Sequence, residues 1–112
     1  SNPTWARALA EITADVIAMG IEDVRSFFDR KGGLYHCAGD GYCSRYDWAR
    51  SIIGETYTGR AVKILLAKTG EFPCRAVRPL FSVLDCRNFS KTFSIRLLNW
   101  REQLALAFQS SP

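Results

Sequence analysis

The apolar residues of the first thirty positions follow a helical period, and this feature constrains the fold more than any other. Their spacings are four, three and four residues in the first run: Trp5, Leu9, Ile12 and Val16. Such spacings put the side chains on one face of a helix. Gly20 interrupts the run, and a second helical pattern then extends to Gly32-Gly33. We therefore predict two helices, over about residues 4–19 and 21–31, each with one face on the core.

Capping residues predict two further helices. Ser44 or Asp47 can cap a short helix over about residues 45–53, which Gly54 would end. Near the C-terminus, Asn99 is followed three residues later by Glu102, which is the spacing of a capping box. A helix over about residues 100–109 is therefore predicted at the end of the chain.

The hydrophobic period changes from residue 60 onward. Val62, Ile64 and Leu66 alternate with Ala61, Lys63 and Leu65, and over residues 92–97 apolar side chains alternate with polar ones. Such alternation is typical of a strand with one buried face. A helix over residues 58–70 is the alternative for the first run, because short apolar runs do not separate the two structures. We predict a small antiparallel sheet over about residues 60–98. The fold class is then α+β, in a single compact domain spanning residues 1–112.

Charge is distributed unevenly along the chain. The net charge is +4, but residues 1–43 carry four basic and six acidic side chains, whereas residues 44–112 carry eleven and five. A segment with such an excess of cations is suited to a polyanionic partner, although a solvated surface rich in arginine gives the same composition.

Arginine and aromatic residues are interleaved in this basic part of the chain. Arginine and lysine neutralise phosphates, and tyrosine stacks on unpaired bases. We therefore expect a small nonenzymatic module that binds nucleic acid through residues 42–96. The residues expected to make the contacts are Arg45, Arg50, Arg60, Lys63, Arg75, Arg78, Tyr42 and Tyr46.

The same residue types support a second hypothesis, a protein-protein interaction domain. Residues 34–46 have no sustained period and contain Gly39-Asp40-Gly41, which indicates a loop. Tyrosine and arginine are frequent among the residues that dominate the binding energy of protein interfaces. The contacts of this alternative would come from Tyr35, His36, Tyr42 and Tyr46. The sequence leaves the oligomeric state open.

The four cysteines lead to a third hypothesis and to an expected cellular compartment. Cys37 with Cys43 and Cys74 with Cys86 could form two disulfides in an exported domain. The alternative is four reduced thiols, with Cys74 and Cys86 behaving as small hydrophobes, and a cytoplasmic protein. We expect the cytoplasmic location unless the disulfides form.

No residue pattern identifies a catalytic centre, a metal site or a bound cofactor. His36 is the only histidine and adjoins Cys37, but neighbours in an extended loop project to different sides, so they do not make a nucleophile and its base. Five residues separate Cys37 from Cys43, more than in compact zinc sites. No apolar run approaches the roughly 20 residues that cross a bilayer. The protein is therefore expected to be nonenzymatic, without cofactor, metal or membrane partner.

Overall fold

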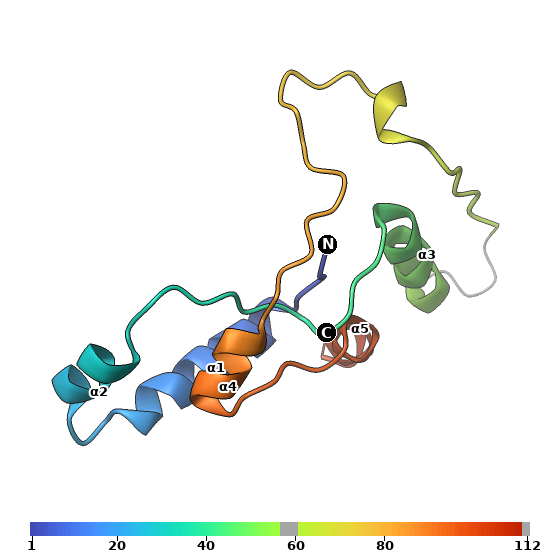
Figure 1. Ribbon diagram of the computed structural model, residues 1–112. Coiled ribbons are helices and arrows are strands. Elements are labelled where there is room, and N and C mark those ends of the chain that lie inside the picture. The colour runs from blue at the N-terminus through green and yellow to red at the C-terminus, as the bar shows by residue number, and fades with distance from the viewer. Residues whose placement is uncertain (57–60, 111–112) are drawn as a thin grey trace.

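A computed structural model describes residues 1–56 and 61–110, and over these ranges the protein consists of helices joined by extended segments (Figure 1). The elements follow in this order: α1 (Ala6–Met19), α2 (Val24–Lys31), α3 (Arg45–Thr56), the 3₁₀ turn η1 (Thr69–Glu71), α4 (Arg87–Phe93) and α5 (Trp100–Gln109). The predicted helices over 4–19, 21–31, 45–53 and 100–109 correspond to α1, α2, α3 and α5. None of the helices within the described ranges is long and apolar enough to span a bilayer.

The predicted helix boundaries have local chemical causes. The Asp23 side chain accepts a hydrogen bond from the backbone N–H of Ser26, with 3.0 Å between Oδ1 and N, and so caps α2. Asn99 and Glu102 form the expected capping box at α5. Each of these bonds satisfies a backbone N–H that the helix itself leaves unpaired, so the boundary is fixed by the local sequence.

Two separate hydrophobic clusters form the core. The first contains the buried side chains Phe27, Phe89 and Phe93, with α1 packed against it through Ile12 and Val16. It therefore joins α1, α2 and α4. In Figure 1, α4 lies along α1, and α2 stands near the C-terminal end of α1. Gly20 allows this packing, because a Cβ at that position would lie 2.6 Å from the Phe27 ring.

The second cluster joins α3 to α5. Trp100 is 1% exposed and packs with Cys43 and Leu104. The Trp48 ring of α3 meets the Trp100 ring edge-on, with 5.7 Å between their centroids. Aromatic pairs favour this arrangement because the positive edge of one ring faces the negative face of the other. The C-terminal helix is thereby fixed against α3.

The predicted α+β fold is wrong, because the described residues contain no β-strand. Within them, the expected antiparallel sheet over residues 60–98 is replaced by an extended segment and by α4. The alternation over residues 92–97 is real, since Phe93 and Leu97 are buried and Arg96 is exposed. However, Phe93 ends a helix, and the extended stretch that follows forms only one isolated parallel bridge, between Asp40 and Asn99. Alternation predicts an extended chain, but a sheet also requires a partner strand.

Residues 61–84 form an extended segment that we call the arm. In Figure 1 it makes a wide arc, coloured yellow to orange, that leaves the helices and returns to them before α4. Its only regular element in the described structure is η1. The Cα radius of gyration of the protein is 17.8 Å, whereas a compact domain of this size has about 13 Å. The arc of the arm away from the helices contributes to this expanded shape (Figure 1).

Candidate functional site

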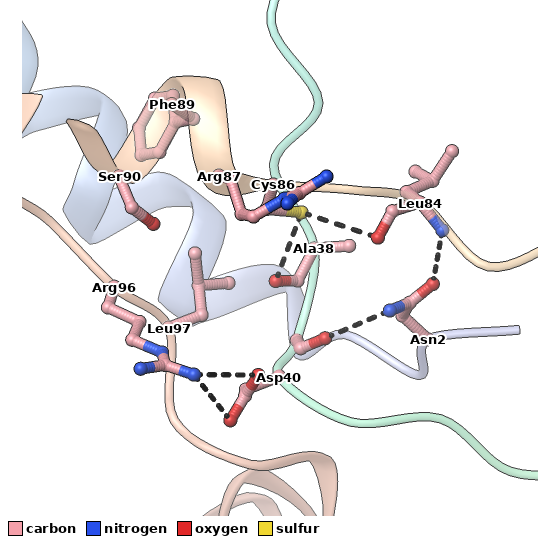
Figure 2. Close-up of a pocket in the computed structure, with 11 residues that line it drawn as sticks. Asn2, Ala38, Asp40, Leu84, Cys86, Arg87, Phe89, Ser90, Arg96 and Leu97 are labelled. Atoms are coloured by element: carbon pink, nitrogen blue, oxygen red, sulfur yellow. Dashed lines mark hydrogen bonds and ion pairs between the residues drawn. The ribbon is translucent and has the colours of Figure 1, made fainter. Parts of the chain in front are cut away.

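A cavity of about 390 Å³ lies where four segments of the chain meet (Figure 2). Cavities that bind small molecules typically measure about 300–1,000 Å³. The segments are the N-terminus, residues 38–40, the start of α4, and the extended stretch before α5. The lining residues are Asn2, Ala38, Gly39, Asp40, Leu84, Cys86, Arg87, Phe89, Ser90, Arg96 and Leu97.

Asn2 connects three of the chain segments around the cavity. Its side-chain Nδ2 donates to the carbonyl oxygens of Gly39 and Gly41, at 3.3 and 3.0 Å, and its Oδ1 accepts from the backbone N–H of Leu84 at 2.8 Å. One amide therefore uses both its donor and its acceptor groups to hold the end of the arm beside residues 39–41. The shape of the cavity depends on this side chain.

Two glycines let the chain pass closely at this point. A Cβ on Gly39 would lie 2.3 Å from the carbonyl oxygen of Pro3, and Gly41 has a φ of +74°, a region that disfavours residues with a Cβ. The backbone N–H of Asp40 donates to the Leu98 carbonyl, and the N–H of Trp100 donates to the Asp40 carbonyl, both at 3.0 Å. Asp40 is thereby held at the wall of the cavity.

Asp40 faces Arg96 across one side of the cavity. Arg96 Nη2 lies 3.4 Å from both carboxylate oxygens of Asp40, and both side chains are exposed. Well-formed charge-assisted hydrogen bonds between these groups measure about 2.7–2.9 Å. The Arg96 guanidinium is therefore weakly held and can turn toward an anion in the cavity.

Arg87 lies on the opposite side and is paired more closely. Its Nε and Nη2 atoms donate to the Asp85 carboxylate at distances of 2.6–3.0 Å. The hydrogen bonds from Arg87 lower the pKa of Asp85 from its ordinary value of 3.8 to about 2. The carboxylate therefore stays ionised at neutral pH and keeps Arg87 oriented beside the cavity.

These groups suit an anionic, oxygen-rich ligand. Two guanidinium groups, Arg87 and Arg96, stand at a cavity that is also lined by Ser90. Arginine recognises phosphate through paired, planar N–H donors, and hydroxyls bind sugar oxygens. Elsewhere in residues 1–56 and 61–110, no three His, Cys, Asp or Glu side chains gather as metal ligands.

All four cysteines are free thiols in the structure. Burial raises the pKa of the Cys37 thiol, and the neighbouring Cys86 raises it further. Burial also raises the pKa of Cys43. A thiol with a raised pKa forms less thiolate and is a poorer nucleophile at neutral pH. The pairs Cys37/Cys43 and Cys74/Cys86 are not joined in this fold.

The residues expected to contact nucleic acid are spread over separate parts of the molecule. Arg45 and Arg50 lie on the exposed surface of α3, where the Arg50 guanidinium sits 5.7 Å from the centre of the Tyr46 ring. Lys63, Arg75 and Arg78 lie on the arm and are exposed, and Arg60 lies outside the described residues. Among the described residues of this set, none lines the cavity.

The loop residues of the protein-interaction hypothesis lie in different environments. Tyr35 belongs to the core, because its ring contacts Phe89 and Phe93 and its hydroxyl donates to the Lys31 carbonyl at 2.6 Å. His36 is exposed. Tyr42 is exposed as well, and its ring meets Phe81 of the arm at 5.5 Å.

Sequence reasoning missed the residues that line the cavity. Asn2, Arg87, Ser90 and Arg96 come from three segments up to 94 positions apart and share no motif. The available signals were Gly39 and Gly41, which we interpreted as an ordinary turn. Gly39 in fact permits the close approach of Pro3, and a Cβ on Gly41 would lie 2.8 Å from the Asn99 side chain.

The amino-acid sequence matches the family model described as the RmlD substrate binding domain over residues 1–111. Three similar curated proteins have related descriptions. The spore coat polysaccharide biosynthesis protein SpsK of Bacillus subtilis is 33% identical over 103 residues, which cover 92% of this chain and 31% of that protein. The dTDP-4-dehydrorhamnose reductase of Sinorhizobium fredii is 36% identical over 72 residues, which cover 62% of this chain and 24% of the relative.

The third relative is the dTDP-4-dehydrorhamnose reductase of Burkholderia thailandensis. It is 31% identical over 113 residues, which cover 93% of this chain and 37% of the relative. The chain therefore spans between about a quarter and two fifths of the length of these proteins. No solved structure matches the chain.

Proposed function

Because the chain belongs to the RmlD substrate binding domain family, we propose that it binds the nucleotide-sugar substrate of a reductase acting in polysaccharide precursor synthesis. The family match over residues 1–111 is the observation that carries this proposal. The names of the relatives, two of them dTDP-4-dehydrorhamnose reductases, indicate the substrate class. The chain would supply the substrate-binding part of a longer enzyme.

Family membership also corrects the function predicted from the sequence. A nonenzymatic module that binds nucleic acid through Arg45, Arg50 and neighbouring residues is wrong, and so is its alternative, an interaction domain using loop 34–46. The chain belongs instead to the substrate-binding part of an enzyme family. The prediction failed because arginines that bind a nucleotide diphosphate and arginines that bind a nucleic-acid backbone produce the same composition.

The cavity supports the proposal through its chemistry. A nucleotide sugar carries a diphosphate with negative charge, flanked by a nucleoside and a sugar rich in hydroxyl groups. Arg96, loosely paired with Asp40, is free to bind the diphosphate, and Arg87 adds a second positive charge. Asp40, released from Arg96, can then accept hydrogen bonds from sugar hydroxyls. The binding site in this proposal is centred on Arg96 and Asp40, and Asn2 holds the segments around it in place.

Calorimetric titration of the protein with dTDP tests the proposal. Hydrogen bonds to charged groups contribute about 1.5–3 kcal/mol, so Arg96→Ala should weaken dTDP binding by about tenfold or more. Arg25→Ala is the matched control, because Arg25 is an exposed arginine on α2 and does not line the cavity. Thymidine, which lacks the diphosphate, should bind the two variants equally. Unchanged dTDP affinity in Arg96→Ala would refute this assignment of the site.

A further inference from the structure

The arm exposes an unusual amount of apolar surface for a segment of a folded protein. Val77 is fully exposed and Leu80 is 92% exposed. The apolar side chains of the arm that are largely open to solvent are Val62, Leu65, Leu66, Phe72, Val77, Leu80, Phe81 and Leu84. Single exposed hydrophobic residues are common, but a run of them on one segment marks a surface that another molecule covers.

The arm is anchored at its C-terminal end and lies free of the helices over most of its length. The anchor consists of the hydrogen bond from Leu84 N–H to Asn2 and of the contact between the rings of Phe81 and Tyr42. Upstream of Phe81, the chain runs in the arc seen in Figure 1 and forms only the short turn η1. Nearly all residues of the arm are exposed, as in segments that bind a partner in extended form.

The charge of the arm limits what can cover it. Lys63, Lys68, Arg75 and Arg78 are opposed by a single acidic residue of the arm, Glu71. Within the described residues, none of the four cations takes part in an ion pair. Two arms placed against each other would bring like charges together, which disfavours a second copy as the partner.

The length of the relatives identifies a partner. The region that they share with this chain makes up 24–37% of their length, so most of each relative consists of other protein. We propose that the arm docks in extended form on this companion part of the reductase, in an apolar groove edged by acidic side chains. Leu80 enters the groove, and the four cations contact its edge. This proposal depends on family membership and not on which nucleotide sugar binds.

Limited proteolysis with trypsin measures whether the arm is covered. The arm offers cleavage sites after Lys63, Lys68 and Arg75, whereas Pro79 blocks cleavage after Arg78. In the 112-residue protein alone, these sites should be cut rapidly. In a chimera where this chain replaces the matched region of the Burkholderia thailandensis reductase, cleavage should slow by at least about tenfold, because cleavage requires local opening.

Variants then assign the protection to the arm's apolar residues. In the chimera, Leu80→Asp should restore rapid cleavage after Arg75. Leu34→Asp is the matched control, because Leu34 is 88% exposed and lies outside the arm. It should leave cleavage as slow as in the parent chimera. A second chimera that exchanges only residues 61–84 provides the same readout if replacement of the whole region prevents folding.

Two results would overturn the proposal. One is a chimera that melts cooperatively but whose arm is cut as fast as in the chain alone. The other is a dimeric chain, detected by light scattering, in which the arm is already protected and Leu80→Asp yields monomers. Protection of the arm without dTDP binding would count against the proposed nucleotide-sugar site alone, so the two proposals fail separately.

Discussion

Gln103 provides a quantitative test of how the termini are joined. This side chain is 2% exposed. Its Oε1 accepts from the backbone N–H of Trp5 at 2.9 Å, and its Nε2 donates to the Leu98 carbonyl at 2.6 Å. Gln103→Leu leaves the Trp5 N–H without its partner and removes one of two hydrogen bonds to the Leu98 carbonyl, which still accepts from the Asp40 N–H. An unsatisfied group costs about 1–3 kcal/mol and a lost hydrogen bond about 1 kcal/mol. Since Trp5 is only half-buried, we expect a loss of about 2 kcal/mol in total.

Thermal unfolding followed by circular dichroism measures this loss. For a domain of this size, 2 kcal/mol corresponds to a fall in Tm of about 8 °C. Gln109→Leu is the matched control, because Gln109 is exposed at the end of the same helix and should leave Tm within about 2 °C, as surface changes usually do. A Gln103→Leu protein as stable as the parent would show that water or another group satisfies the Trp5 N–H.

The Gln103→Glu variant tests the direction of the hydrogen bonds. An ionised carboxylate can accept from Trp5 but repels the Leu98 carbonyl, so the folded state should raise the pKa of this glutamate. A raised pKa stabilises the folded protein at pH values below the unfolded pKa of about 4.3, and this contribution is lost as the pH rises. The deficit of the variant relative to the parent should therefore be larger at pH 7 than at pH 4. A deficit independent of pH would refute the assigned bond to Leu98.

Three further predictions concern the helix cap, the thiols and the exposed ion pair. Asn99→Ala should lower the unfolding free energy by about 1 kcal/mol in urea titrations, because the α5 capping box is lost. An unchanged urea concentration at the unfolding midpoint would show that the Asn99 side chain does not stabilise the helix. With iodoacetamide at pH 8, the exposed Cys74 should react as fast in the folded protein as in urea. Cys37 and Cys43 should react at least about tenfold more slowly in the folded protein than in urea, because burial limits access and raises their pKa. Uniform rates measured by mass spectrometry would exclude this packing. The ion pair between Asp85 and Arg87 should stabilise the folded protein at pH values above 3.8, the ordinary pKa of Asp85, and this stabilisation should be lost as the pH falls through about 2. In acid unfolding, the unfolding free energies of the parent and of Asp85→Asn should therefore become equal near pH 2. A constant difference from pH 7 to pH 2 would exclude the pair.

The helices were predictable because their signals are local. The intervals from Trp5 to Val16 and the capping box at Asn99 involve residues within one or a few turns of each other, and hydrogen bonding within a helix needs no distant partner. Residues 100–109 were therefore assigned correctly, and α1 differs from its prediction by two residues at its start.

The sheet could not be decided from the sequence, because a strand is defined by its partner. Alternation over residues 61–66 predicted an extended chain, but these residues pair with no strand in the described structure. The short helix α4 was missed because Phe89 and Phe93 show its period only once, in seven residues. Their burial against Phe27 of α2 stabilises this helix, and that contact links residues more than sixty positions apart.

The candidate site shows the same difference between what the local sequence predicts and what long-range contacts decide. The sequence by itself determined an excess of arginine in residues 44–112 and the presence of Gly39 and Gly41. Only the tertiary structure brought Asn2, Asp40 and Arg96 to one cavity, through a backbone bridge at Asp40 and the close passage of Pro3 by Gly39. Composition fixes which charges a chain carries, whereas a binding site depends on distances between residues far apart in sequence, which packing alone sets.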